Sequence, residues 1–401
     1  MLPAMNPLEV ERLRAETPGC TRVLHFNNAG ASLPPAPVVE AQLAHLRLES
    51  EIGGYEAADR AEASAGRAYG AVAALLGAAP DEIAVVENAT RAFDMAFYAF
   101  PFREGDRILC SAVEYASNYL AFLQVARRTG AVVEPVASEA DGSISVTALR
   151  AALRQDDRAR LVALTHVPTN GGLVNPAAEV GRACREAGVP FLLDACQSAG
   201  QMPLDVDVLG CDVLSATARK FLRGPRGVGF LYVRRSLLER LEPPFVDLHA
   251  ATWTAPDRFE WRKDARRFEN WEGNVSAKIG LGVAVDYALA VGLPAIQERV
   301  VALAARLRAA LRRVPGVTVR DLGSAPCAIV TFDLAHRDPT DVRDALRLRG
   351  INVSVTAASS TRLDMEARGL VAMVRASVHY YNTEAEVDRF CAELLRLTES
   401  S

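Results

Sequence analysis

The 401-residue sequence predicts an α/β fold, with a mostly parallel central sheet covered by helices on both faces and a smaller α+β domain near the C-terminus. Three observations predict it. Short apolar runs alternate with stretches of helical spacing from Ile83 to Thr217. Some of these runs end on polar side chains, as strands of an open α/β sheet do at the edge where ligands bind. Two long helical stretches then lead to strand-like runs at 327–332 and 373–377.

The expected elements follow this alternation along the chain. A short strand at 24–26 should enter a turn at 27–30, and helices should follow at 34–50 and 67–76 with an interruption at 51–56. Further strands are expected at 83–86, 107–110, 132–136, 161–167 and 191–194 and in a run ending near 217, with helices from 91 and at 146–154 and 176–187. The glycine-rich stretch 224–229 is expected to be a loop, and helices at 277–291 and up to 313 should follow it. We expect a large domain at 21–275 and a small domain formed by 1–20 and 276–401.

Composition, charge and the motifs that are missing argue against several classes of protein. The net charge is −4, so no basic surface for nucleic acid is expected. The polar, acidic first 16 residues resemble neither a signal peptide nor a transit peptide, and no apolar run approaches membrane-spanning length. Seven scattered cysteines without metal-ligand spacing predict no metal site and fit a reducing cytoplasm. No Walker loop and no GxGxxG motif after a strand is present, which argues against a nucleotide-dependent enzyme.

Lysine is rare in this sequence, and one lysine follows a predicted strand. Of the 45 basic residues only Lys220, Lys263 and Lys278 are lysines. Arginine stays protonated in proteins, whereas a desolvated lysine can attack a carbonyl group, so a lysine in this background suggests amine chemistry. Asp194 ends the strand before it. A lysine that forms a Schiff base and a carboxylate that keeps a pyridine nitrogen protonated are the pair that pyridoxal phosphate requires.

Several motifs of this region resemble the class V aminotransferase family, which includes cysteine desulfurases and selenocysteine lyases. They are Asp-Ala-Cys-Gln at 194–197, Pro-Leu-Asp-Val at 203–206, Gly-Cys-Asp at 210–212, Arg-Lys at 219–220 and Gly-Pro-Arg-Gly-Val-Gly at 224–229. The resemblance implies a fold type I enzyme with pyridoxal phosphate in the large domain and an amino acid as substrate. It also implies a homodimer, because segments matching those around Arg226 and Trp271 reach the neighbouring subunit's cofactor in the family.

The resemblance also assigns roles to individual residues. Lys220 would form the Schiff base and act as the base, and Asp194 would hold the pyridine nitrogen. Other cofactor contacts would come from Gln197, Ala89, Thr90, Tyr115, Thr217, Arg219 and Gly227, and substrate contacts from Arg375, Asn28, Thr169 and Asn170. From the residues alone, an ordinary helix N-cap explains Thr90 equally well, a plain turn explains Asn28, and a surface ion pair explains an isolated strand arginine.

Two departures from the family bear on the reaction. Desulfurases carry a cysteine on the loop before the substrate-binding arginine, and the interval 351–374 contains none. Arg219 replaces the usual histidine beside the lysine, and with Gly53, Gly54 and Tyr55 it gives a pattern similar to hercynylcysteine sulfoxide lyases. A persulfide-forming desulfurase is therefore not expected.

Three hypotheses remain from the sequence. The first is a lyase that cleaves the C–S bond of a cysteine S-conjugate or sulfoxide by α,β-elimination. The second is an epimerase or aminotransferase on the same scaffold, resembling isopenicillin N epimerase. The third, a protein that only binds pyridoxal phosphate, is disfavoured by the joint presence of Lys220, Asp194 and Arg375. Release of pyruvate and ammonia would support the first. Loss of optical activity or transfer to a keto acid would support the second.

Overall fold

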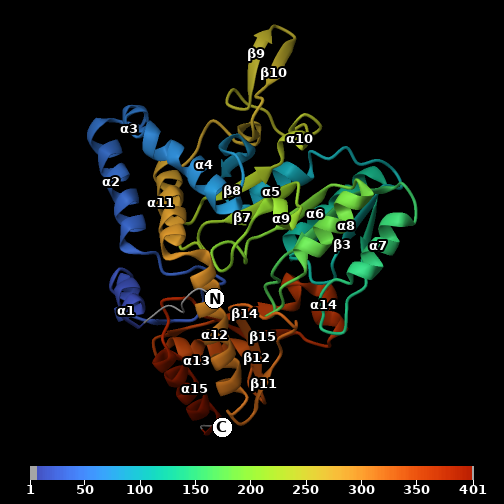
Figure 1. The fold of residues 1–401 in the computed structure, drawn as a ribbon. Helices are drawn as coiled ribbons and strands as arrows, with labels where there is room; N and C mark the ends of the chain where they lie inside the picture. The colour runs from blue at the N-terminus through green and yellow to red at the C-terminus, as the bar shows by residue number, and fades with distance from the viewer. Residues whose placement is uncertain (1–6, 400–401) are drawn as a thin grey trace.

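The computed structural model describes residues 7–399 and contains a seven-stranded sheet in the order β2-β8-β7-β6-β5-β3-β4 (Figure 1). The neighbours from β7 through β4 are parallel, and β8 runs antiparallel to both β2 and β7. This confirms the predicted α/β fold with a mostly parallel sheet. The strands are β2 (Ile83–Val86), β3 (Arg107–Cys110), β4 (Val132–Pro135), β5 (Ala159–Thr165), β6 (Phe191–Asp194), β7 (Val213–Thr217) and β8 (Gly229–Val233).

The register of three adjacent strands places their carboxyl ends at the same level along one edge of the sheet. Thr165 of β5 lies opposite Asp194 of β6, and Asp194 lies opposite Ser215 of β7. The central strands are buried along their length, as expected for a parallel sheet with helices on both faces. Polar side chains at these strand ends therefore share one edge.

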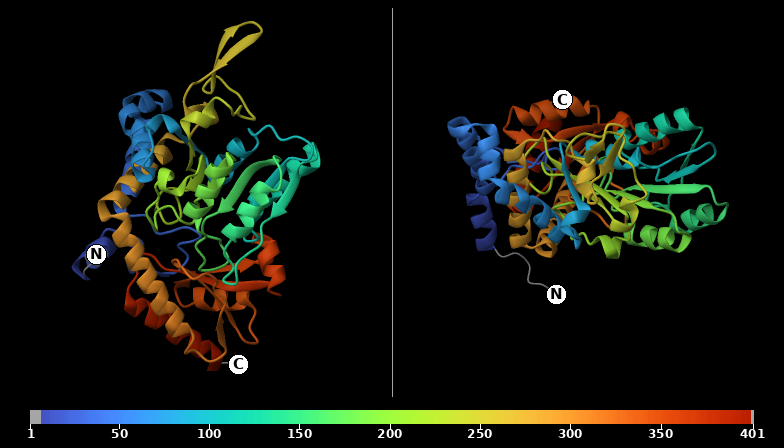
Figure 2. Two further views of the ribbon diagram at one scale, coloured as in Figure 1. Left: turned by 45° about the vertical axis from the view of Figure 1, so that its right-hand side comes forward. Right: turned by 90° about the horizontal axis from the view of Figure 1, so that it is seen from above.

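Helices surround this sheet, as the views in Figure 2 show. One difference from expectation lies at 51–56, where the structure interrupts the helix only at Gly53. Gly53 has φ 98°, a backbone conformation that favours glycine. The helix α2 therefore ends before Gly53, and α3 begins at the next residue. The helices that precede the second sheet in the chain are α1 (Pro7–Ala15), α2 (Ala36–Ile52), α3 (Gly54–Arg60), α4 (Glu62–Leu76), α5 (Ala89–Phe97), α6 (Ala116–Thr129), α7 (Val146–Arg154), α8 (Ala177–Ala187), α9 (Val206–Leu209), α10 (Arg235–Leu238), α11 (Val275–Val291) and α12 (Leu293–Leu311).

A second, antiparallel sheet lies in the C-terminal third, in the order β11-β12-β15-β14. Its strands are β11 (Val317–Val319), β12 (Ile329–Leu334), β14 (Ser354–Ala357) and β15 (Ala372–Ser377), and its helices are α13 (Pro339–Arg347), α14 (Arg362–Ala367) and α15 (Glu384–Glu399). The expected strands at 327–332 and 373–377 correspond to β12 and β15. The short strand β1 (Leu24–His25) pairs in parallel with β13 (Ile351–Asn352), so the beginning of the chain is tied to this C-terminal part.

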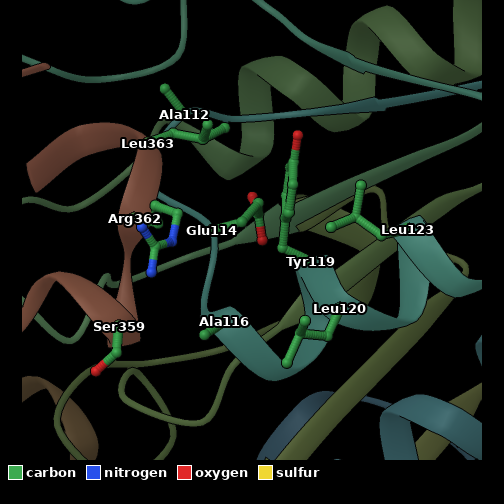
Figure 3. A pocket seen from close by; sticks show the side chains of 9 residues that line it. All are labelled: Ala112, Glu114, Ala116, Tyr119, Leu120, Leu123, Ser359, Arg362 and Leu363. Atoms are coloured by element: carbon green, nitrogen blue, oxygen red, sulfur yellow. The ribbon is translucent and has the colours of Figure 1, made fainter. Parts of the chain in front are cut away.

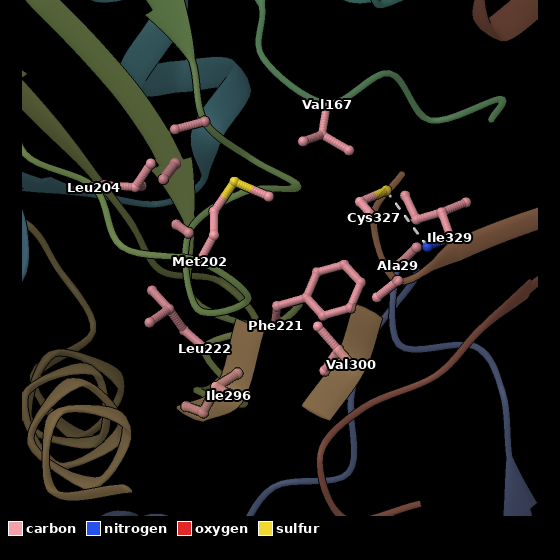
Figure 4. Packing of buried hydrophobic residues seen from close by; sticks show 14 of the residues in the cluster. Ala29, Val167, Met202, Leu204, Phe221, Leu222, Ile296, Val300, Cys327 and Ile329 are labelled. Atoms are coloured by element: carbon pink, nitrogen blue, oxygen red, sulfur yellow. Dashed lines mark hydrogen bonds between the residues drawn. The ribbon is translucent and has the colours of Figure 1, made fainter. Parts of the chain in front are cut away.

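The two-domain division at 21–275 stays a prediction, and residues 1–6 of its N-terminal segment lie outside the described residues. The helix α11, which follows the predicted boundary, packs against α2 and α4 of the larger part. Between the two sheets, apolar side chains from distant segments pack together (Figure 4). Phe221 and Met202 come from the large part, Val300 from α12 and Ile329 from β12. Burial of each such side chain contributes about 1.5–3 kcal/mol, and this packing holds the two parts together.

A hairpin of β9 (Ala251–Ala255) and β10 (Arg258–Trp261) projects from the large part (Figure 1). Within residues 7–399 no single helix is both long and apolar enough to cross a membrane. Only α11 and α12 together meet that condition, and the chain bends by 78° between them. The same residues contain no group of three or more His, Cys, Asp or Glu side chains that could hold a metal ion.

Candidate active site

A cavity of about 140 Å³ lies where β5, β6 and β7 end and α5 begins. This is the edge at which polar side chains were expected to meet. Its walls contain most of the residues that the sequence singled out. They are Asn88, Ala89, Thr90, Tyr115, Thr165, Val167, Thr169, Asp194, Cys196, Gln197, Thr217, Arg219 and Lys220.

Lys220 is one of these lining residues and lies three residues after β7 ends. Burial of its amine lowers the pKa of Lys220, and the positive charges of Arg219 and Arg375 lower it further. A lower pKa raises the fraction of neutral amine near pH 7, and the neutral amine is the form that attacks a carbonyl group or removes a proton.

Asp194 is buried, and each of its carboxylate oxygens has a donor. Asn118 Nδ2 on α6 donates to Oδ2 at 2.8 Å, and the backbone N–H of Cys196 donates to Oδ1 at 2.9 Å. Both contacts fix the direction of the carboxylate. Sequence reasoning missed Asn118, because nothing local links a helix residue to a strand end 76 positions away.

The first turn of α5 forms another wall of the cavity. Asn88 caps this nine-residue helix by accepting a hydrogen bond from the backbone N–H of Arg91 at 2.9 Å. Ala89 and Thr90 follow in its first turn, where free N–H groups suit a phosphate. Gly229 of β8 passes close behind, and a Cβ atom there would lie 2.8 Å from the carbonyl carbon of Asn88, so only glycine fits.

Tyr115 is held in place through its backbone by a buried polar network. Its N–H donates to Thr165 Oγ1 at 3.2 Å, and that hydroxyl donates to Glu114 at 2.6 Å. Glu114 also accepts from the Ser111 hydroxyl at 2.6 Å, and burial raises the pKa of Glu114 to about 7. The sequence had indicated Tyr115 but not this support. The tyrosine ring forms a wall of the cavity and could stack on a flat ligand.

One end of the Gln197 side-chain amide contacts the N-terminal turn, and the other end is free. Its Nε2 donates to the carbonyl of Ala29 at 3.1 Å, while its buried Oε1 has no hydrogen-bond partner in the part of the chain that the structure describes. A buried polar atom without a partner is costly and indicates a missing ligand. An amine, an acid, an aromatic wall, a helix N-terminus and this amide together fit pyridoxal phosphate.

Arg375 of β15 approaches the cavity from the C-terminal part. Its Nη1 donates to both the hydroxyl and the carbonyl of Thr169, the carbonyl at 3.2 Å. Its Nε is buried and has no hydrogen-bond partner within residues 7–399. Burial, with the charge of Arg219 adding to it, lowers the pKa of Arg375 to about 10. The guanidinium therefore remains charged at neutral pH and retains a free donor.

The remaining predicted residues do not line the cavity. The amide of Asn170 donates to Asp364 on α14, so it connects the two parts of the molecule. Asn28 is fully buried, donates to the carbonyl of Ser377 at 2.7 Å and accepts from Tyr381 at 2.5 Å. Gly227 is exposed in its loop with φ 76°. Their predicted roles as ligand contacts remain predictions.

Cys196 is a cavity residue to which the sequence analysis gave no role. It follows Asp194 by two positions and lies beside Lys220 in the cavity wall. Burial raises the pKa of the Cys196 thiol to about 12. The thiol therefore stays protonated at neutral pH and is a weak nucleophile.

A second cavity, of about 270 Å³, has Glu114 and Ala116 in its lining, the two neighbours in sequence of Tyr115 (Figure 3). Leu120 and Leu123 of α6 face Arg362 and Leu363 of α14 across it. The residues of α14 that line this cavity belong to the interval 351–374, where desulfurases carry their cysteine, and no thiol lines this cavity. Its lining is mainly apolar. The lining residues are Ala112, Glu114, Ala116, Tyr119, Leu120, Leu123, Ser359, Arg362 and Leu363.

Comparison with known proteins relates this geometry to a family. The model of the family described as aminotransferase class-V matches residues 23–390. The chain is 34% identical to a "probable hercynylcysteine sulfoxide lyase" of Mycobacterium tuberculosis, over 98% of this chain and 94% of that protein. It is 30% identical to a "probable cysteine desulfurase" of Xylella fastidiosa, over 96% of this chain and 95% of that protein. The solved structure of a cysteine desulfurase from Thermococcus onnurineus is similar with a TM-score of 0.91, 26% identity and full coverage of both chains.

Proposed function

The chain belongs to the class V aminotransferase family, and on that premise we propose that it cleaves the C–S bond of a cysteine S-conjugate or sulfoxide by α,β-elimination. Family membership confirms the resemblance seen in the motifs. The protein is a C–S lyase that uses pyridoxal phosphate as its cofactor and acts on cysteine or its derivatives. Which derivative it accepts, and by which route it breaks the bond, are the parts we propose.

The observation that carries the proposal is an amine, a carboxylate and a guanidinium around one cavity in which no thiolate is available. Lys220 and Asp194 line the cavity, and Arg375 reaches its wall through Thr169. The only cysteine in that wall is Cys196, whose thiol pKa is raised to about 12 by burial. A mechanism that transfers sulfur to a protein thiolate therefore lacks its acceptor, whereas elimination needs none.

Each of these residues has a defined task in the elimination. When bound, pyridoxal phosphate supplies a ring that accepts the electron pair left at the substrate's α-carbon. The amine of Lys220 is the base that removes the α-proton, and its lowered pKa provides the neutral form. Asp194 keeps the ring nitrogen protonated. Arg375 binds the substrate's carboxylate and thereby orients the Cα–H bond.

The atoms of the overall reaction balance with water as the only co-reactant. The Cα–H and Cβ–S bonds break, the sulfur fragment leaves with the bonding electron pair, and it takes up a proton. Addition of water to the remaining three-carbon fragment then releases pyruvate and ammonia. No oxidant or reductant is consumed.

Product analysis tests this proposal. Purified protein with pyridoxal phosphate is incubated with a panel of cysteine S-conjugates and sulfoxides, and pyruvate, ammonia, alanine and optical rotation are followed. We expect pyruvate and ammonia in equal amounts. Alanine as the stoichiometric product, with sulfur trapped on a protein cysteine, would show desulfuration instead. Loss of optical activity without pyruvate would identify an epimerase.

We further propose that the protein is a homodimer whose active sites lie at the subunit interface. Large apolar side chains are exposed in one region of the chain, including Trp253 (78% exposed) and Phe259 (43%) on the β9–β10 hairpin and Trp271 (54%) after η3 (Ala265–Phe268). Exposed aromatic residues of this kind favour a protein–protein interface. Sedimentation should show a dimer, and Trp253→Asp should weaken it. A monomer with full activity would contradict the proposal.

A further inference from the structure

Lys220 lies in the loop between β7 and β8, and one arginine of the same loop bonds directly to its backbone. The N–H of Arg223 donates to the carbonyl of Lys220 at 2.9 Å. Arg223 has φ 60°, in the left-handed region that residues with a side chain seldom adopt. Such a strained conformation persists only where surrounding contacts hold it, and it occurs often at functional sites.

The side chain of Arg223 supplies contacts of this kind. It is 1% exposed, and all three of its nitrogen atoms donate hydrogen bonds. Nε donates to the carbonyl of Leu33 at 2.8 Å, Nη1 to the hydroxyl of Tyr380 at 2.7 Å and Nη2 to the hydroxyl of Thr17 at 2.5 Å. The centroid of the Tyr380 ring lies 5.1 Å from Cζ, within the range of a cation–π contact. The guanidinium therefore ties the loop of Lys220 to the N-terminal segment and to the C-terminal part.

Tyr380 belongs to the segment that follows Arg375, the residue proposed to bind the substrate's carboxylate. The strand β15, which carries Arg375, ends three residues before Tyr380. The preceding residue, His379, makes a second contact with the loop. Its Nε2 donates to the carbonyl of Phe221 at 2.9 Å, and its Nδ1 accepts from the N–H of Tyr380 at 2.9 Å. Burial lowers the pKa of His379 well below its usual value, so the ring is neutral and one tautomer makes both contacts.

We propose that Arg223 is a positioning residue that sets the amine of Lys220 relative to the guanidinium of Arg375. This inference rests on the roles proposed above for Lys220 and Arg375. Removal of the α-proton requires the amine to lie along a Cα–H bond whose direction Arg375 fixes through the carboxylate. A displacement of about 1 Å in such an arrangement lowers a rate about 100-fold. Without the guanidinium the loop would relax from its strained conformation, and the amine would move while the carboxylate site stays in place.

Exchange of the α-proton of L-alanine with D2O, followed by NMR, measures the base without any leaving group. The wild-type holoprotein is compared with Arg223→Met, which keeps a long buried side chain and removes the donors, and rates are expressed per cofactor-loaded site. We expect Arg223→Met to lower the maximal exchange rate about 10- to 100-fold and to change KM less than about threefold. A residue that only stabilised the fold would change the number of loaded sites and not the rate at each site.

Tyr380→Phe is a milder variant that tests the same contact even if Arg223→Met does not fold. It keeps the ring and removes only the hydroxyl that accepts from Nη1. It should lower the maximal exchange rate per loaded site by a smaller factor and leave KM unchanged. Arg107→Met is the matched control, because Arg107 is also a buried arginine, bonds Glu134 at 2.8 Å and lies at the start of β3, at the opposite edge of the sheet from the cavity. The control should lower the thermal midpoint and leave the rate per site unchanged.

Capture of the cofactor gives a second measurement, which needs no substrate. Apo protein is mixed with pyridoxal phosphate, and formation of the borohydride-reducible adduct at Lys220 is followed with time. Arg223→Met should slow this capture at least about tenfold, because the amine is displaced from its line of attack on the aldehyde. Arg107→Met should capture the cofactor at the wild-type rate.

The outcomes separate this inference from the proposed function. Unchanged exchange and capture in the folded variants of Arg223 and Tyr380 would show that the guanidinium only stabilises the fold and would overturn the inference. A higher KM with an unchanged maximal rate would assign Arg223 to the carboxylate site and overturn it as well. If the wild type exchanges the α-proton but releases pyruvate from no cysteine derivative, the elimination is wrong, and the exchange rates still decide the role of Arg223. If the wild type exchanges no α-proton, the capture rates decide it.

Discussion

The hydrogen bond from Asn118 to Asp194 should determine how tightly the protein holds its cofactor. In the apo protein this 2.8 Å contact supplies one of the two donors to the buried carboxylate, and the backbone N–H of Cys196 supplies the other. We consider the substitution Asn118→Leu, which keeps a side chain of similar size on α6 and removes the donor. The carboxylate then keeps a single donor in a buried site.

The size of the effect follows from the nature of the lost contact. A hydrogen bond to a charged group contributes about 1.5–3 kcal/mol. Its loss removes this contribution from the carboxylate that would bind the protonated pyridine nitrogen. At about 1.4 kcal/mol for each factor of ten, the dissociation constant for pyridoxal phosphate should rise about 10- to 150-fold.

A double-mutant cycle measures this directly. Apo protein is titrated with pyridoxal phosphate for the wild type, Asn118→Leu, Asp194→Ala and the double variant. If Asn118 acts through Asp194, Asn118→Leu should change the constant less than twofold once Asp194 is absent. Gln124→Leu is the matched control, because it removes an amide from the same helix that bonds Tyr98 at 2.7 Å. Equal effects of Asn118→Leu in both backgrounds would refute the reasoning.

Three further predictions concern single residues. Lys220→Ala should abolish the borohydride-reducible cofactor adduct seen by mass spectrometry, and a reducible lysine adduct in that variant would contradict the assignment. Arg375→Ala should raise KM and lower kcat together, with kcat/KM falling about 100-fold, because binding and orientation of the substrate are both lost. If Arg375 only bound the substrate without orienting it, steady-state kinetics would show an unchanged kcat. Burial lowers the pKa of His166 from 6.5 to about 4. The contribution of neutral, buried His166 to the free energy of unfolding is therefore complete above pH 6.5 and is lost as the pH falls toward 4. This loss amounts to about 3 kcal/mol. In His166→Gln the free energy of unfolding, measured with urea, should therefore fall less steeply as the pH is lowered, and an unchanged pH dependence would exclude this role for His166.

The alternation of apolar runs with helical stretches predicted the central fold. A parallel sheet buried on both faces requires short apolar strands separated by helices, and β2, β3 and β6 lie at the expected residues. The pair Lys220 and Asp194 was also predicted from the sequence, because Asp194 ends a strand, Lys220 follows one, and lysine is rare in this chain. Chemistry that depends on residue type and on position after a strand can be predicted in this way.

The sequence could not determine which of two neighbouring side chains lines the cavity. Thr169 and Asn170 are neighbours in sequence, yet Thr169 lines the cavity and holds Arg375, while Asn170 bonds Asp364 away from it. Both residues lie in a turn after β5, where the local backbone sets the direction of each side chain, so an uncertainty of one residue changes the assignment.

The sequence by itself determined which chemical groups this protein has available, and the tertiary structure decided which of them meet. The strand order of the large sheet does not follow the chain, so Asn118 on α6 reaches Asp194 on β6 only through packing. Arg219 was predicted to contact the cofactor, and the structure adds that its Nη1 donates to the carbonyl of Gly30. These contacts join residues 76 and 189 positions apart, and tertiary packing selects their partners, which local sequence patterns do not encode.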